Sequence, residues 1–174
     1  VQLTAVGDIM IYDDILAAAQ KAEGVYDFSD CFTAVAAYTM GADLTVGNLE
    51  LNFCGEPYSG KPDFRAPESL AKTLSSIGFD VLQTANTYSI QNGLSGLQST
   101  IRYLDAAGLS HVGTYAAQDD KTSLGGVLLK NVNGVKIAFI AYTKGLNYLT
   151  LPEGEEYAVD VLYTDYASDF NKIN

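Results

Sequence analysis

Basic residues are the first thing that the sequence lacks. Its 10 Lys and Arg side chains are outnumbered by 21 Asp and Glu, and the formal net charge is −11 at pH 7. The basic residues are spread along the chain and form no cluster. Because proteins hold nucleic acids mainly through positive charge, we expect no nucleic-acid partner. The acidity is interpreted as a solubility feature.

Long apolar runs are also missing. No run approaches the roughly 18 residues that a membrane span needs, and the chain has no signal-peptide pattern. It begins at Val1 rather than at Met, and its first residues already have the pattern of a strand. We therefore expect that a leader has been removed before this numbering starts.

Cysteine and histidine are scarce. Cys31 and Cys54 are the only cysteines, and they allow either one disulfide or two free thiols, because spacing alone does not decide between the two. His111 is the only histidine, so no site within this chain can use more than one imidazole.

Apolar residues, in contrast, are abundant enough for a folded domain. They make up 48% of the 174 residues, and only 18% are charged, a balance typical of globular proteins and not of disordered ones. This length suits one domain with a sizeable core. We expect a single domain over residues 1–174.

Helical and strand patterns alternate along the chain, which predicts an α/β layered sheet. Strands are predicted at 2–6, 42–48, 79–85 and 109–112, followed by a hairpin of 126–131 and 135–142 and a further strand at 158–162. Helices are predicted at 13–24, 30–41, 67–78, 94–107 and 165–173. Residues 113–123 are predicted to be a polar connection. Both faces of the hairpin carry apolar residues, so we expect an incomplete sheet edge through which the chain can associate.

Polar residues follow three of the predicted strands where each strand ends. Asp8 follows the first strand, Asn48 and Glu50 end the second, and Asn86 follows the third. Right-handed crossovers place these strand ends at one edge of the sheet, so we expect one shared pocket. Carboxylate and amide oxygens suit a divalent cation. The alternative, which spacing alone favours, is that Asp8 and Asn48 only cap turns.

Several motifs share the order and spacing of one known family. They are AVGDIM at 5–10, YDF at 26–28, GNLE at 47–50, GKP and FRAP within 60–67, GFDV at 78–81, LDAAG at 104–108, HVGT at 111–114, NGVKIAF at 133–139 and YT at 142–143. In these motifs the chain resembles the CapA-like capsule or poly-γ-glutamate synthesis proteins, from residue 1 to about 163.

The resemblance implies a fold, a place and a site. The implied fold is a calcineurin-like metallophosphoesterase-type β-sandwich flanked by helices, with its C-terminal part missing from this chain. The implied location is extracellular or at the cell surface, with an anchor in the full-length protein. By motif match, Asp8 and Glu50 take metal-ligand positions with Asn48 beside them, and the implied cofactor is a divalent metal such as Mn, Zn, Fe or Mg.

The chain departs from the family pattern at the third strand end. Where the family has Ala-Asn-Asn-His, this chain has Ala85, Asn86, Thr87 and Tyr88. Thr87 therefore takes a ligand position and Tyr88 the catalytic histidine position, and Gln91 replaces a nearby Asp. A neutral hydroxyl is a poor ligand for a divalent metal, and tyrosine, with a reference pKa of about 10, is a poor general acid at pH 7. His111 matches a non-catalytic position, and the further histidine motifs of the family are absent.

Three functional hypotheses remain open after this comparison. The first is a metal-dependent phosphoesterase of envelope polymer synthesis, completed by residues beyond Asn174. The second is a non-catalytic module that binds an envelope polymer, glycan or peptide. The third is a structural partner in a membrane-bound synthesis or export complex. Thr87 and Tyr88 favour the second and third for this chain, with a weak metal site or none. The partners we expect are an envelope polymer or its precursor and that complex.

Overall fold

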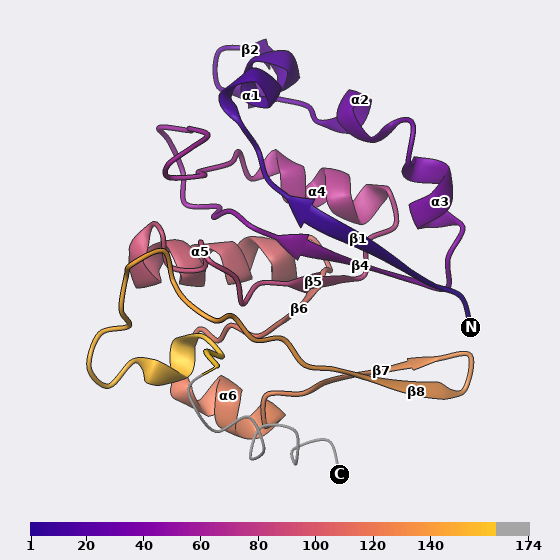
Figure 1. Ribbon diagram of the computed structural model, residues 1–174. Coiled ribbons are helices and arrows are strands. Elements are labelled where there is room, and N and C mark those ends of the chain that lie inside the picture. The colour runs from indigo at the N-terminus through magenta and orange to yellow at the C-terminus, as the bar shows by residue number, and fades with distance from the viewer. Residues whose placement is uncertain (163–174) are drawn as a thin grey trace.

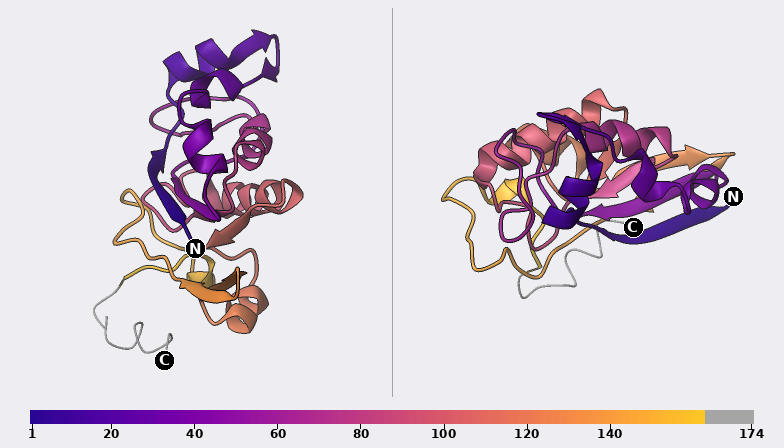
Figure 2. Two further views of the ribbon diagram at one scale, coloured as in Figure 1. Left: turned by 90° about the vertical axis from the view of Figure 1, so that its right-hand side faces the viewer. Right: turned by 90° about the horizontal axis from the view of Figure 1, so that it is seen from above.

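A parallel four-stranded sheet forms the centre of the protein (Figure 1). The structure is a computed structural model, and it describes residues 1–162. The strand order is β1 (Leu3–Ile9), β4 (Leu44–Leu49), β5 (Val81–Gln83) and β6 (Ser110–Val112). Helices α4 (Ser69–Ser76) and α5 (Gly93–Ala106) lie together along one side of the sheet, as the view from above in Figure 2 shows. This arrangement confirms the predicted α/β class.

Shorter elements surround the sheet. Between β1 and β4 lie α1 (Asp13–Ala19), β2 (Gln20–Ala22), β3 (Val25–Tyr26), α2 (Ser29–Phe32) and α3 (Ala36–Met40). After β6 come α6 (Gln118–Leu124), the antiparallel hairpin of β7 (Leu128–Val132) and β8 (Val135–Phe139), and the 3-10 helix η1 (Glu156–Ala158). The hairpin turns at Asn133 and Gly134, both with positive φ, as the Asn-Gly signal predicts.

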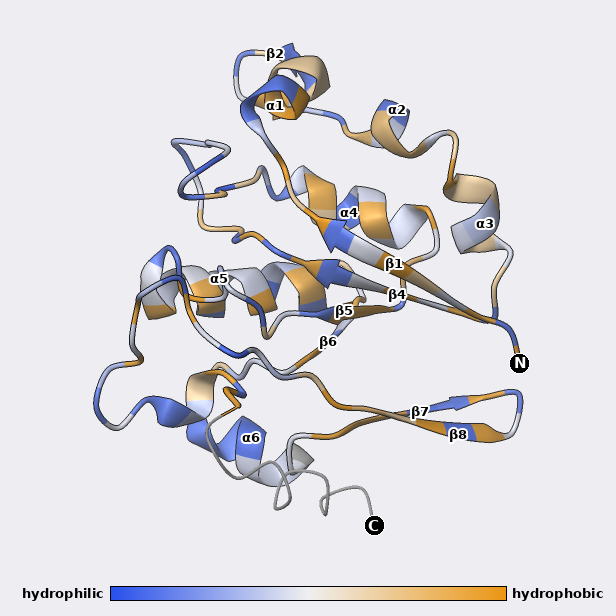
Figure 3. Ribbon diagram, in the orientation of Figure 1, coloured by the Kyte–Doolittle hydropathy of each residue, from blue (hydrophilic) through white to orange (hydrophobic). Residues whose placement is uncertain are grey.

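Two apolar cores lie against the sheet, and β5 contributes to both. Val81 and Leu82 are fully buried neighbours that belong to different clusters, because successive side chains of a strand point to opposite faces. Leu82 packs in the cluster that includes Leu70 and Leu74 of α4. Val81 packs in the cluster that reaches Val159. Figure 3 shows apolar residues on α4 and α5, and polar residues over α6 and at the ends of β1 and β4.

The structure corrects several local predictions. The helix expected at 30–41 is divided into the two short helices α2 and α3. Residues 118–124 form α6 instead of a polar connection, because the Asp120 carboxylate accepts a hydrogen bond from the Ala117 backbone N–H (3.0 Å) and caps the helix. Helix α1 ends at Ala19, and the chain then pairs as β2 and β3. The expected strand at 158–162 reduces to isolated bridges of Val159 with Thr114 and Val161 with Thr143. The predicted helix at 165–173 lies outside the described residues.

Both cysteines are free, and the hairpin is partly exposed. Cys31 and Cys54 are not joined by a disulfide. Leu129 in β7 is 67% exposed and Val135 in β8 is 49% exposed, and within residues 1–162 these two strands pair with each other alone. Association through this edge stays a prediction. None of the helices in the described part of the chain is long and apolar enough to cross a bilayer.

Gly113 joins the sheet to the segment that covers it, and this position gives a test of the packing. Its φ is +95°, and a Cβ placed there would lie 2.5 Å from the Ala85 Cβ and 3.0 Å from the Ala141 carbonyl oxygen. Gly134 has a similar φ of +83°, but nothing lies within 4 Å of its added Cβ. Gly134→Ala is expected to lower the free energy of unfolding by about 1–2 kcal/mol through backbone strain alone.

Gly113→Ala adds overpacking of about 1–3 kcal/mol to the same backbone strain. We therefore expect a clearly larger loss of stability than for Gly134→Ala, measured by urea denaturation of both variants. Equal losses would show that residues 85 and 141 do not pack against Gly113 as described.

Candidate functional site

A β-bulge in β1 decides which residue of that strand lies beside Asn48. Ala5 pairs with Val46, but the next registered pair is Asp8 with Asn48, so three steps along β1 match two along β4. In a regular register Gly7 would stand opposite Asn48, and Asp8 would lie on the other face. The extra residue therefore brings the Asp8 carboxylate to the same face as the Asn48 amide.

The Asn48 side chain links the two carboxylates of the site. Its Nδ2 donates hydrogen bonds to Asp8 Oδ1 and to Glu50 Oε2, each at 2.8 Å. Burial raises the pKa of the Glu50 carboxyl, and the nearby charge of Asp8 raises this pKa further, while the hydrogen bond from Asn48 opposes both effects. Within residues 1–162, no basic side chain forms an ion pair with Asp8 or Glu50. The pair is thus held together by an amide and not by a positive charge.

Asn86 joins Asp8, Asn48 and Glu50 through a hydrogen bond to Asn48, and these four residues are called the strand-end cluster. Strand β5 ends at Gln83, which pairs with Asn48 across the sheet. Beyond it, Asn86 Nδ2 donates to Asn48 Oδ1 (3.0 Å) and to the Leu49 carbonyl oxygen (2.8 Å). Asn86 Oδ1 accepts from the Tyr88 backbone N–H at 3.1 Å. The structure therefore brings all four predicted side chains together at three strand ends, with Asn86 in a second layer behind Asn48.

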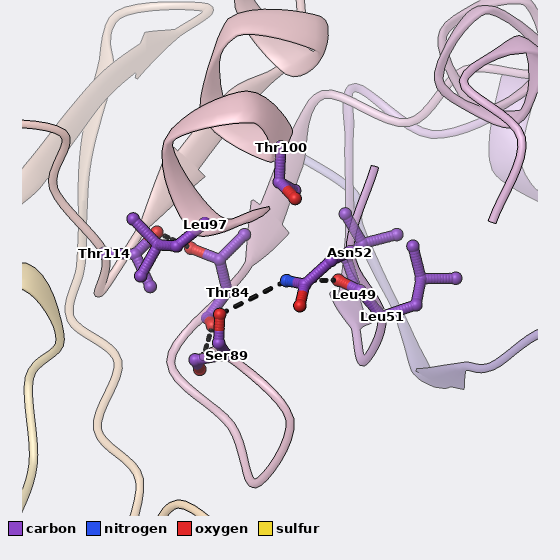
Figure 4. A pocket seen from close by; sticks show the side chains of 8 residues that line it. All are labelled: Leu49, Leu51, Asn52, Thr84, Ser89, Leu97, Thr100 and Thr114. Atoms are coloured by element: carbon purple, nitrogen blue, oxygen red, sulfur yellow. Dashed lines mark hydrogen bonds between the residues drawn. The ribbon is translucent and has the colours of Figure 1, made fainter. Parts of the chain in front are cut away.

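Two residues that the sequence analysis did not identify support the loop that carries Asn86. The Ser89 hydroxyl accepts from the Asn86 N–H (2.7 Å) and donates to the Thr84 carbonyl (2.6 Å). Asn52 Nδ2 donates to the Ser89 carbonyl at 3.2 Å, as Figure 4 shows. The cavity drawn there measures about 10 Å³, which is room for about one water molecule. It belongs to the support of the loop and is too small for a ligand. In the sequence, only the polar composition of residues 84–92 indicates that polar side chains such as Ser89 support this loop.

Thr87 and Tyr88, the two residues that depart from the family pattern, differ in burial. Thr87 is exposed in the middle of the loop. Tyr88 is half-buried, and its ring packs edge-to-face on Phe64, with ring centres 4.7 Å apart. Phe64 in turn packs against Tyr12 at 5.2 Å. The Tyr88 ring thus belongs to an aromatic group beside the cluster.

Gln91 and His111 are engaged elsewhere. Gln91 Oε1 accepts a hydrogen bond from Asn147 Nδ2 at 2.9 Å. His111 lies in β6, at the opposite end of the strand order from β1. Burial lowers the pKa of its imidazole, although the charge of Asp105 opposes this effect. His111 is therefore not part of the strand-end cluster.

The donor set of the cluster fits a hard divalent cation. Asp8 and Glu50 offer carboxylate oxygens, which Mg²⁺ and Mn²⁺ prefer, and no basic side chain within residues 1–162 forms an ion pair with them. The described part of the chain brings no third Asp, Glu, His or Cys to the pair. The protein would thus supply two carboxylates, with Asn48 beside them, and water would complete the coordination. Metal binding itself stays a prediction.

Comparison with known proteins identifies the family. The family model described as "Bacterial capsule synthesis protein PGA_cap" matches residues 2–169. The chain belongs to this family. Its α/β fold, with a parallel sheet flanked by helices, is consistent with the CapA and metallophosphoesterase-like fold.

Individual relatives agree with the family assignment. The capsule biosynthesis protein CapA of Bacillus anthracis is 29% identical over 147 residues, which are 81% of this chain and 34% of that protein. Two uncharacterized proteins of Sinorhizobium fredii, y4sH and y4uA, are each 32% identical over 91 residues, 47% of this chain and 20% of each relative. The chain therefore spans about a third or less of the length of these relatives.

Restoring the family residues at the third strand end gives a direct test of the two departures. Thr87→Asn restores the amide and Tyr88→His the imidazole of the family pattern in the loop whose Asn86 contacts Asn48. We expect the double variant to bind Mn²⁺ more tightly than the wild type in calorimetric titration, without turnover of a chromogenic phosphodiester. Tyr88→Phe keeps the ring on Phe64 and serves as the control, with unchanged affinity. Turnover by either the wild type or the double variant would show that Tyr88 has been misinterpreted.

Proposed function

We propose that this chain acts in the synthesis or export of a poly-γ-glutamate capsule at the cell surface, and that it binds the polymer or its precursor without hydrolysing a phosphoester. The family assignment supports a role in capsule synthesis. The observation that carries the binding role is the composition of the strand-end cluster, namely two carboxylates on one amide, with a packed tyrosine in the place of the family histidine.

The residue types at the cluster argue against efficient hydrolysis. Phosphoester cleavage needs a positioned nucleophilic water and a second charge clamp on the phosphoryl group. Asp8 and Glu50 could orient one cation, but neither Thr87 nor Tyr88 offers a good further ligand. A tyrosine is also a weaker general acid at neutral pH than the family histidine.

Charge sets a condition on this binding role. The chain carries a net charge of −11, and the two carboxylates of the cluster have no basic partner among residues 1–162, so a polymer of glutamate would be repelled. A divalent cation bound by Asp8 and Glu50 would neutralise their two charges and could also coordinate a carboxylate of the polymer. The Asn48 amide holds the two carboxylates together at that point. Binding of the polymer should therefore depend on divalent cations.

Retention of poly-γ-glutamate by the purified protein tests this proposal. We expect retention in Mg²⁺ or Mn²⁺, its loss in EDTA, and at least a tenfold weaker apparent affinity for Asp8→Asn with Glu50→Gln, because both carboxylates of the cation site are then gone. The double variant Asp119→Asn with Glu153→Gln removes the same charge from exposed positions elsewhere, and it should bind as the wild type or slightly better.

Three results would overturn the proposal. Retention of the polymer in EDTA would show that binding does not need a divalent cation. Failure of the polymer to bind under any condition would show that poly-γ-glutamate is not the ligand. Cation-dependent hydrolysis of a phosphodiester that is lost in Asp8→Asn would establish the phosphoesterase hypothesis instead.

A further inference from the structure

We infer that Asn86 is a positioning residue that turns the Asn48 amide with its nitrogen toward the two carboxylates, and so lowers the cation affinity of the site. The inference rests on the proposed function in one respect only, that the ligand of the carboxylates is a divalent cation. It assigns Asn86 a role different from the ligand role that its position at a strand end suggests.

The backbone fixes the orientation of the Asn86 amide. The Leu49 carbonyl oxygen can only accept a hydrogen bond, and it lies 2.8 Å from Asn86 Nδ2. The Tyr88 backbone N–H can only donate, and it lies 3.1 Å from Asn86 Oδ1. Exchanging the oxygen and nitrogen of Asn86 would therefore place donor against donor and acceptor against acceptor. Only one orientation satisfies both backbone groups.

That orientation is passed on to Asn48. The second hydrogen on Asn86 Nδ2 points to Asn48 Oδ1 at 3.0 Å, so the Asn48 oxygen faces Asn86. The Asn48 nitrogen must then face Asp8 and Glu50, and it donates one hydrogen to each at 2.8 Å. All four amide hydrogens of the two side chains are used, and every acceptor matches a donor.

Burial makes this arrangement costly to change. Asn86 is 6% exposed, and its backbone N–H donates a hydrogen bond to the Ser89 hydroxyl. A buried polar group that loses its partner costs more than the hydrogen bond contributed. Asn48 is therefore held with its N–H groups toward the position that a cation would take. Only its oxygen could bind a cation, and that oxygen faces Asn86. For Asn48 to ligate, its amide must turn and break the hydrogen bond to Asn86.

Removing the Asn86 amide should free Asn48 to turn. We expect Asn86→Ala to bind Mn²⁺ about three- to tenfold more tightly than the wild type, which is the equivalent of about one hydrogen bond. In an Asn48→Ala background the same substitution should have no effect, because Asn86 acts through Asn48. Calorimetric titration of the wild type, the two single variants and the double variant completes this double-mutant cycle. Weaker binding by Asn86→Ala, or an equal effect in both backgrounds, would identify Asn86 as a ligand or as a general structural residue.

A second measurement needs no cation. The side-chain amide signals of Asn48, identified by their absence in Asn48→Ala, should be protected from hydrogen exchange in the wild type and unprotected in Asn86→Ala. Unchanged protection overturns the inference whatever the metal does. If no form of the protein binds Mn²⁺ but this protection is lost as expected, the proposed function fails and the orientation of Asn48 by Asn86 is upheld.

Discussion

The Asn48 amide shared between Asp8 and Glu50 is the contact on which the strand-end cluster depends. Burial raises the pKa of the Glu50 carboxyl and the nearby charge of Asp8 raises it further, and this amide supplies the N–H groups that hold the two carboxylates together. The contact exists because one extra residue in β1 brings Asp8 opposite Asn48. A local irregularity of the backbone, and not the regular sheet, therefore creates the cluster.

The sequence could predict the framework but not this detail. Apolar strands that end in polar turns place Asp8, Asn48, Glu50 and Asn86 at one edge, because parallel strands with right-handed crossovers share that edge. The bulge has no signal beyond Gly7, so the pairing of Asp8 with Asn48 required the structure. The direction of the Asn48 amide likewise depends on the Leu49 carbonyl and the Tyr88 N–H, which no spacing rule reveals.

The same limit explains the errors outside the site. Helix α6 contains seven residues and begins after Ala117, which is not a residue that caps helices through its side chain. Its capping interaction comes from Asp120, which also suits a loop. Helix α4 was predicted because Leu70 and Leu74 form an apolar stripe that packs in the core. Elements with a clear apolar period were thus predictable, and short polar elements were not.

Paramagnetic line broadening by Mn²⁺ tests most directly whether the three strand ends form one cation site. We expect that substoichiometric Mn²⁺ broadens the backbone amide signals of residues 8, 48–50 and 86–88 first. Asp8→Asn with Glu50→Gln should abolish this broadening, because both carboxylates are then lost. Broadening centred on the pocket of about 410 Å³ lined by Asp105, His111 and Asp120, or spread over the acidic surface without a centre, would contradict the account.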